Sequence, residues 1–205
     1  MNKVCFYIMK HDTGFAPNPF HGVCTLAACP PNHMKYRPLL SPGDVIAGVF
    51  RSGQSPRLVY SMEIENELGL DSYYRDPRFQ CKKPRIHGDW RARAGDNIYY
   101  RNGKGHWLQD ENAGFHKKGE EDDEWRKDVC GNRVYMGRRF VYLGENAVLL
   151  PRKLWTYLPP SQGISYLKAD SYKRDYEHCR SWIAQMGSGV KGKPRDRNDK
   201  ACESC

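Results

Sequence analysis

The sequence predicts an α+β fold in which short strands form a small mixed, partly closed sheet with helices attached to it. Runs of β-branched and aromatic residues recur along the chain, and the few helical patterns are mostly late. No strand is followed by a glycine-rich loop and a helix, and Gly-x-x-x-x-Gly-Lys-Ser/Thr does not occur. These observations disfavour a doubly wound dinucleotide-binding or phosphate-loop enzyme.

The strands are predicted from local patterns. Residues 4–9 are β-branched and aromatic, and residues 44–50 form a nearly continuous apolar run typical of a buried strand. Residues 57–65 alternate, with Leu58, Tyr60, Met62 and Ile64 expected on one face, so the last two segments predict a hairpin. Residues 97–101 and 139–143 are further strand candidates.

Three segments predict helices or helix starts. Asp71 is expected to cap a short helix over 72–75 that ends before Pro77. The acidic run 120–124 indicates a solvated loop or a helix start. A late helix, capped by Asp170 or Ser171, is predicted from apolar residues at helical spacing. We expect these apolar residues to pack in the core; they are Tyr172, Tyr176, Cys179, Ile183 and Met186.

The length of 205 residues suits one domain with a substantial core. We expect this domain over 1–186, with a helical C-terminal extension over 151–186. Residues 187–205 are rich in Gly, Lys, Arg and Asp and predict a flexible basic tail. The apolar run at 4–9 is too short for a signal peptide, and no membrane segment is visible, so a cytoplasmic location without membrane contact is expected.

Basic residues are concentrated in one part of the chain. The formal charge is +9, and residues 71–118 carry 11 basic and 6 acidic side chains. Within 78–104 the cations are interleaved with the aromatic residues Phe79, Trp90, Tyr99 and Tyr100. This mixture suits nucleic acid. The alternative is a solvated loop with ordinary charges.

One long stretch carries no charge at all. Residues 13–34 contain several prolines and aromatics, which predicts a rigid loop packed against the body of the protein. Exposing Asp12, Asn18, His21 and Thr25 on such a loop is a common way to build a site. The alternative is a structural loop whose polar groups satisfy their own backbone.

The cysteines allow several interpretations. In a cytosolic protein they are thiols or metal ligands rather than disulfides. Cys24 with His21 or His11 nearby forms a candidate nucleophile and base, and one candidate zinc set is Cys24, Cys29, Cys202 and Cys205. Buried inert thiols are the default, so we expect no metal and no cofactor.

A second group of candidate residues spans 73–80 and 95–100. Arg78 suits a phosphate or a base edge, Phe79 suits stacking, and Gln80 or Asn97 suits a base edge. Asp96 is a candidate general base or an acceptor for an exocyclic amine. The alternative is an aromatic subcore with Asp96 in an Asx-turn.

Taken in order, these blocks resemble a known family. The order Ala16-Pro17-Asn18-Pro19-Phe20, Cys24-Thr25-Leu26-Ala27, Gly43-Asp44-Val45-Ile46, Asp76-Pro77-Arg78-Phe79-Gln80 and Gly95-Asp96-Asn97-Ile98-Tyr99 resembles the second type of nucleotide-modification-associated domain. The resemblance covers about residues 3–150. That family occurs in bacteria and phages near genes for hypermodified DNA bases, which implies a nucleotide or nucleic-acid context but not a reaction.

Gly43-Asp44 before a buried strand is also similar to the PUA-like superfamily, which includes ASCH, EVE and YTH domains. That similarity implies a small, partly closed PUA-like β-barrel and an aromatic-lined pocket for RNA or a modified base. Trp90 and Trp107 are the candidate pocket tryptophans.

The sequence therefore predicts a binding module for a nucleotide or nucleic acid, with DNA favoured over RNA, connected with DNA base modification or phage–bacterium conflict. We expect a pocket between residues 12–25 and 78–99. The predicted contacts are Asn18, Phe20, Thr25, Arg78, Phe79, Gln80, Asn97, Tyr99 and Trp107. The alternative is an enzyme acting on a nucleotide or base by acid–base or Cys-nucleophile chemistry, with candidate catalytic residues Asp12, His21, Cys24 and Asp96. The oligomeric state is not predicted.

Overall fold

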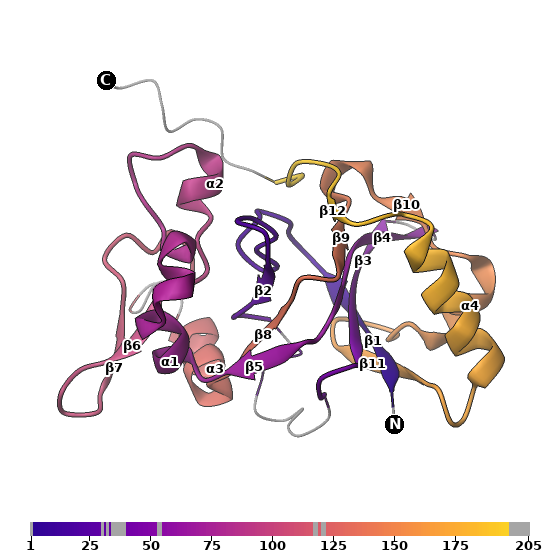
Figure 1. Cartoon of the computed structure of the whole chain (residues 1–205), viewed down its shortest axis with the longest axis horizontal. Coiled ribbons are helices and arrows are strands. Elements are labelled where there is room, and N and C mark those ends of the chain that lie inside the picture. Colours follow the sequence, from indigo (N-terminus) through magenta and orange to yellow (C-terminus); the bar gives the residue numbers. More distant parts are fainter. Residues whose placement is uncertain are drawn as a thin grey trace.

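A seven-stranded mixed sheet forms one half of the protein (Figure 1). The computed structural model describes residues 2–29, 31, 33, 40–52, 55–116, 119 and 122–196. The strands of the large sheet are β1 (Lys3–Met9), β3 (Val45–Ser52), β4 (Ser55–Glu63), β9 (Phe140–Tyr142), β10 (Val148–Leu149), β11 (Ile164–Lys168) and β12 (Gly189–Val190). They follow the order β11-β1-β3-β4-β9-β12, and β10 pairs with β4. The β1–β3 and β9–β12 pairs are parallel, and the other pairs are antiparallel.

The predicted hairpin is confirmed as β3 and β4, but one of its side chains faces the other way. The register shifts between Gly48 and Val49, so that Val59 lies between the residues paired with them. Such a bulge reverses the face on which the following side chains lie. Leu58 therefore packs with Val49 on one side of the sheet, whereas Tyr60 packs on the opposite side.

Two smaller sheets form the other half of the protein. One has the order β2-β8-β5 and contains β2 (Cys24–Leu26), β8 (Val134–Gly137) and β5 (Asn66–Leu68). The other pairs β6 (Tyr99–Arg101) with β7 (Trp107–Gln109). The α+β class is confirmed, but no sheet among the described residues closes into a barrel. The PUA-like barrel is not confirmed, because closure requires pairing between the edge strands, and β11 and β12 lie at opposite edges of the large sheet.

The helices lie around these sheets and correct two predicted caps. They are α1 (Leu70–Arg75), α2 (Trp90–Arg93), α3 (Asp122–Gly131) and α4 (Lys173–Ala184), with 3-10 turns η3 (Pro77–Lys82), η4 (Gly144–Asn146) and η5 (Arg152–Tyr157). Asp71 lies in the first turn of α1, which begins after Gly69. Tyr172 precedes α4 without a side-chain cap, so neither Asp170 nor Ser171 caps that helix. The predicted helix start in the acidic run is confirmed by α3.

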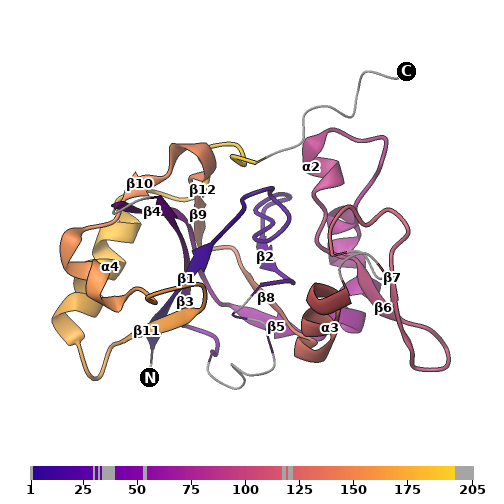
Figure 2. The ribbon, with the colours of Figure 1, turned by 180° about the vertical axis from the view of Figure 1, so that it is seen from behind.

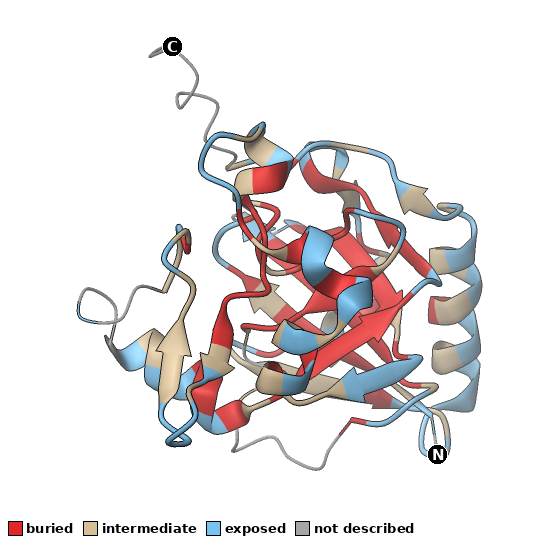
Figure 3. Cartoon of the chain, turned by 60° about the vertical axis from the view of Figure 1, so that its left-hand side comes forward, coloured by how far each residue is buried: buried red, intermediate tan, exposed pale blue. Residues whose placement is uncertain are grey.

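Alternation along the central strands divides the core into layers. Figure 3 shows that these strands are largely buried. Cys5 and Tyr7 pack on one side of the sheet, whereas Val4 and Phe6 pack on the other side, which α4 and η5 cover. Cys179 of α4 is fully buried there, so the predicted core role of the α4 stripe is confirmed, except that Tyr172 is 52% exposed. A third cluster, around Tyr73 and Val134, joins the small sheets to α1 and α3.

The terminal segment is held against the large sheet. Beyond β12, the Lys191 amide donates to the Tyr142 carbonyl, the Glu145 amide donates to the Lys193 carbonyl, and the Asp196 amide donates to the Asp12 carbonyl. The flexible-tail prediction is therefore wrong for 189–196, since backbone hydrogen bonds rather than apolar side chains hold this segment.

Residues 197–205 lie outside the described residues, and the expected division at 151 and 186 stays a prediction. Residues 187–192 have Gly-x-Gly-x-x-Gly spacing, but they follow α4 and contain β12, which is not the strand-to-helix context of a dinucleotide loop. No helix in the described part of the chain is both long and apolar enough to cross a membrane.

Candidate functional site

The structure brings several predicted site residues together in a buried polar network. Asn18 and Thr25 exchange backbone hydrogen bonds at 2.8 and 2.9 Å. The Thr25 hydroxyl donates to Asp96 Oδ2 at 2.7 Å, and the Tyr73 hydroxyl donates to Asp96 Oδ1 at 2.8 Å. All four residues are buried, so the uncharged loop and the segment before β6 are joined through polar side chains.

Lys82 completes this network and was not predicted as part of it. Its Nζ donates to Asn18 O at 2.9 Å, Asn18 Oδ1 at 2.8 Å and Val23 O at 2.7 Å. Burial lowers the pKa of Lys82 although Asp96 opposes this shift, and burial raises the pKa of Asp96 although Lys82, Thr25 and Tyr73 oppose it. The Asn97 side chain donates to the carbonyls of Tyr73 and Phe79. These side chains line neither of the two cavities described below, and their contact with a ligand stays a prediction.

A smaller cavity of about 540 Å³ contains Arg78 and Phe79 together with His21 and Arg138. Arg78 is exposed, but its guanidinium is already held by Asp76, with an Nη2–Oδ2 distance of 2.6 Å. His21 adopts a left-handed backbone conformation with φ 62°. Burial lowers the pKa of His21, and the charges of Lys82 and Arg85 lower it further.

The other predicted residues are separated from one another. Asp12 is buried and accepts from the Tyr142 hydroxyl and the Arg195 amide. Cys24 is fully buried, and burial raises its pKa to about 12, so its thiol is protonated at neutral pH.

Four more residues that the sequence predicted to contact a ligand have neighbours within the protein. Phe20 packs edge-to-face on Trp90, and the Gln80 amide donates to the carbonyls of Tyr74 and Asp76. Tyr99 is buried, and Trp107 lies under the guanidinium of Arg101.

The larger cavity measures about 900 Å³ and lies between the end of β1, the loop at residues 10–16 and α3. We name it the α3 cavity. Its wall contains Phe15 and Phe115, whose ring centroids are 4.9 Å apart in a stacked arrangement. The edge of His116 packs against Phe15 at 5.3 Å between centroids.

A buried carboxylate stands behind two histidines of this wall. Asp128 accepts from the Tyr99 hydroxyl at 2.8 Å, and His116 Nδ1 lies 2.6 Å from Asp128 Oδ2. His33 Nε2 is 3.7 Å from Asp128 Oδ1. Burial alone raises the pKa of Asp128, but the interactions with His116, His33 and Tyr99 outweigh it and hold this pKa below its usual value. The carboxylate is therefore ionised at neutral pH and orients the His116 ring.

The backbone around His116 is fixed in an unusual conformation. His116 has φ 52°, in the left-handed region that non-glycine residues rarely adopt. The Gln109 amide, at the end of β7, donates to the carbonyls of Phe115 and His116 at 3.2 and 2.9 Å. Strained residues of this kind persist only where surrounding contacts hold them, and they cluster at functional sites.

The wall of the α3 cavity contains several cations and the thiol of Cys29. Lys10 and Arg126 line it and form no ion pair with a described residue, whereas Lys127 pairs with Glu124 at 2.8 Å. The excess of positive charge suits an anionic group. Burial raises the pKa of Cys29 to about 12, which keeps this thiol protonated.

The described residues contain no group of three or more His, Cys, Asp or Glu able to hold a metal ion. Two members of the candidate zinc set, Cys202 and Cys205, lie outside the described residues.

A family model described as nucleotide modification associated domain 2 matches residues 1–201. The chain belongs to this family. The predicted resemblance is confirmed, and the match extends well beyond residues 3–150. The family description associates the chain with nucleotide modification. No curated protein and no solved structure gives a significant match.

Sequence reasoning missed the most concentrated chemistry of this nucleotide modification associated domain. His33 lies far from the other two residues in the chain, His116 and Asp128 are 12 residues apart, and no short motif connects the three. Lys82 was one cation within a basic stretch, and nothing in its neighbours indicated burial. Only the acidic helix start at α3 was visible in the sequence, without its histidine partners.

Proposed function

We propose that this nucleotide modification associated domain binds one nucleotide in the α3 cavity. The observation that carries the proposal is that one cavity combines an aromatic wall, two histidines held by a buried carboxylate, and cations that form no ion pair with a described residue. The family description supports a nucleotide context. Binding of a modified base, and DNA rather than RNA as its source, remain parts of the proposal.

Each part of a nucleotide has a matching group in the cavity. A base stacks on the half-buried ring of Phe115, which the buried Phe15 supports from behind, and such stacking contributes about 1–3 kcal/mol per base in comparable sites. The guanidinium of Arg126 and the amine of Lys10 suit a phosphate. The cavity volume of about 900 Å³ lies within the range of small-molecule sites.

The experiment is calorimetric titration with dAMP, dCMP, dGMP and dTMP. Phe115→Ala is expected to weaken binding by about 5–150-fold, the equivalent of one lost stacking contact. Arg126→Ala is expected to weaken binding several-fold, because a charge-assisted contact to the phosphate is lost. The matched control is Arg174→Ala on α4, since Arg174 is also exposed and forms no ion pair with a described residue.

Circular dichroism establishes that each variant is folded. Equal affinities for Arg126→Ala and Arg174→Ala, with Phe115→Ala also unchanged, would place the nucleotide elsewhere. No binding of any of the four nucleotides to the unmodified protein contradicts the proposal outright.

A second candidate function, an enzyme acting on the bound nucleotide, is favoured by the 2.6 Å contact between His116 Nδ1 and Asp128. A carboxylate that orients an imidazole in this way supports general acid–base chemistry. The test is mass spectrometry of the four nucleotides after incubation with the protein. A time-dependent mass change that His116→Gln abolishes supports the enzyme, and unchanged masses alongside measurable binding contradict it.

A further inference from the structure

Aromatic rings and cations are stacked on residues of α1, β6 and β7 that do not line the α3 cavity. The rings of Tyr74 and Tyr100 are parallel within 20°, with centroids 4.5 Å apart. Lys83 Nζ lies 3.5 Å from the centroid of the Tyr74 ring. A lysine and two tyrosines thus form one continuous stack from η3 to β6.

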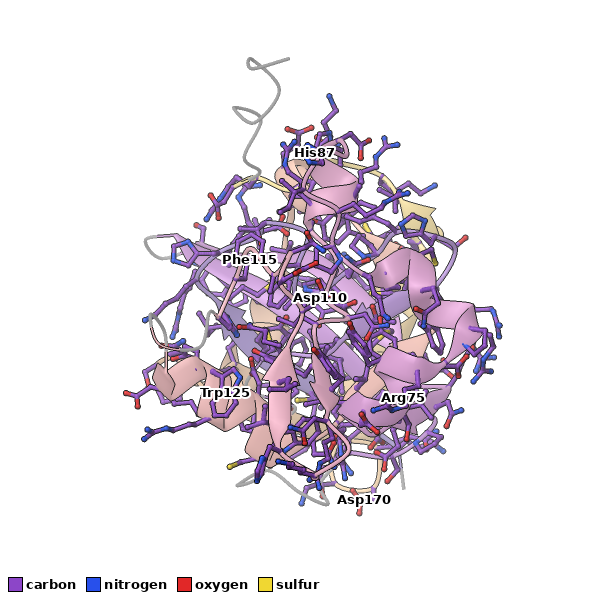
Figure 4. All side chains as sticks on the ribbon, turned by 90° about the vertical axis from the view of Figure 1, so that its left-hand side faces the viewer. Arg75, His87, Asp110, Phe115, Trp125 and Asp170 are labelled. Atoms are coloured by element: carbon purple, nitrogen blue, oxygen red, sulfur yellow. The ribbon has the colours of Figure 1, made fainter. Side chains whose placement is uncertain are left out.

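A second stack lies on the hairpin of β6 and β7. Arg101 and Trp107 are paired across the two strands, and the guanidinium carbon of Arg101 is 4.5 Å from the Trp107 ring centroid. We name the surface made by both stacks the α1–β7 face, with the members Tyr74, Lys83, Tyr100, Arg101 and Trp107. Figure 4 looks onto this end of the molecule, with Arg75 and Asp110 labelled.

Hydrogen bonds hold the face in place. Asp71 accepts from the Arg101 amide at 2.7 Å and from Arg75 Nε at 3.1 Å. Arg75 Nη2 donates to the Arg101 carbonyl at 2.6 Å. The Tyr74 hydroxyl donates to Asp110 at 2.8 Å, which fixes the plane of its ring. The aromatic surfaces are therefore positioned before any partner binds.

Most acidic residues of this region are already engaged, which leaves an excess of positive charge. Between residues 70 and 111, Asp71 pairs with Arg75, Asp76 pairs with Arg78, Asp89 accepts from the Ala92 amide, Asp96 is buried, Asp110 accepts from the Tyr74 hydroxyl, and Glu111 is exposed. The cations that form no ion pair with a described residue are Lys83, Arg85, Arg91, Arg101 and Lys104. Lys83 is half-buried, and the other four are exposed.

We propose that the α1–β7 face binds single-stranded nucleic acid. Pre-positioned aromatic rings beside uncompensated cations are the combination that binds unpaired strands, because bases stack on the rings while cations track the phosphates. A duplex keeps its base faces internal and offers only its phosphates to such a surface. The face is a second site, for a polymer, and the nucleotide site of the α3 cavity is not needed for it.

Fluorescence anisotropy with a fluorescein-labelled (dT)12 strand and a duplex of equal length tests this proposal. The variant Lys83→Glu/Arg101→Glu is expected to bind (dT)12 at least about 10-fold more weakly than the unmodified protein. The slope of log K against log salt should fall by about 1.4, the loss of two phosphate contacts on a single strand. Tyr100→Leu should weaken (dT)12 binding about 5-fold or more and leave the salt slope unchanged, because stacking is not ionic.

The matched control is Lys173→Glu/Arg174→Glu on α4, at the opposite end of the molecule in both views (Figures 1 and 2). It changes the net charge equally, so it reports the effect of overall charge alone, and its affinity is expected within about 2-fold of the unmodified protein. Equal losses in the two double variants, or duplex binding as tight as (dT)12 binding, overturn the proposal. Calorimetry with mononucleotides separates the two sites, because the α1–β7 variants are expected to leave mononucleotide binding unchanged. Failure of one proposal therefore does not imply failure of the other.

Discussion

Replacing the buried Lys82 by methionine tests whether the polar network holds the two family-motif segments together. Methionine keeps much of the aliphatic length of lysine but removes the ammonium. The substitution removes the Lys82 donor from the carbonyl and amide oxygens of Asn18 and from the carbonyl of Val23. The Asn18 carbonyl still accepts from the Thr25 amide, and Asn18 Oδ1 still accepts from the Phe20 amide, so the loss is greatest at the Val23 carbonyl. It also removes the positive charge that opposes the raised pKa of Asp96.

The magnitude follows from these losses. Each buried acceptor left unpaired costs about 1–3 kcal/mol. Part of this cost is offset because the lysine charge no longer has to be buried. Removing one member of a buried charged pair has a net cost of about 3–5 kcal/mol in other proteins. For a chain of this length, that corresponds to a decrease in Tm of about 6–20 °C.

The assay is urea denaturation followed by tryptophan fluorescence at neutral pH, with Lys83→Met as the matched control. Lys83 is half-buried, and against the described part of the chain its ammonium has the Tyr74 ring as its contact and no ion pair, so its replacement should cost at most about 1 kcal/mol. Adding Asp96→Asn to Lys82→Met should cost less than the sum of the two single changes, by about 1 kcal/mol or more, because the isolated carboxylate is neutralised. A Lys82→Met cost no greater than that of Lys83→Met would refute this reasoning.

Three further expectations concern other parts of the fold. Gly137→Ala should destabilise the protein by about 3 kcal/mol, since an added Cβ lies 2.0 Å from the Glu63 carbonyl oxygen, whereas Gly103→Ala, with open space around it, should be nearly neutral in the same urea assay. Asp128→Asn should destabilise the protein at neutral pH. Because the folded-state pKa of Asp128 is lowered, this carboxylate stabilises the fold fully above its unfolded pKa of about 4. The difference from the unmodified protein should shrink as the pH falls below that value and through the lowered folded-state pKa, and an undiminished difference in acid contradicts the assignment. His21→Gly should stabilise the fold by about 0.5–1 kcal/mol by removing left-handed strain at φ 62°, and a lower Tm would contradict this.

Local patterns predicted the parts of the fold that local sequence controls. The hairpin of β3 and β4 follows from an apolar run beside an alternating one, and both strands are present. The bulge at Val59 was not predictable, because only the register with the partner strand β3 shows that Val59 has no paired residue there. The terminal segment at 189–196 was missed for a related reason, since backbone hydrogen bonds hold it and leave no hydrophobic pattern.

The candidate sites also divide into parts that local sequence patterns predicted and parts that depend on contacts between distant segments. The blocks containing Asn18 and Asp96 lie together, but their polar side chains form a buried network. A cavity does lie between the two segments, at residues 21–23 and at Arg78 and Phe79, and the network side chains do not line it. The α3 cavity is lined by the end of β1 with the loop that follows it, by residues around Cys29 and His33, and by His116 and α3, which are separated along the chain. Its histidines were not distinguishable from ordinary ones until the fold placed Asp128 between them.

A crystal structure of the protein grown with dAMP, dCMP, dGMP or dTMP, whichever binds most tightly, tests the central claim most directly. One nucleotide is expected in the α3 cavity, with its base against Phe115 and its phosphate beside Lys10 or Arg126. Nucleotide density found only in the cavity of Arg78 and His21, or only on the α1–β7 face, would contradict it.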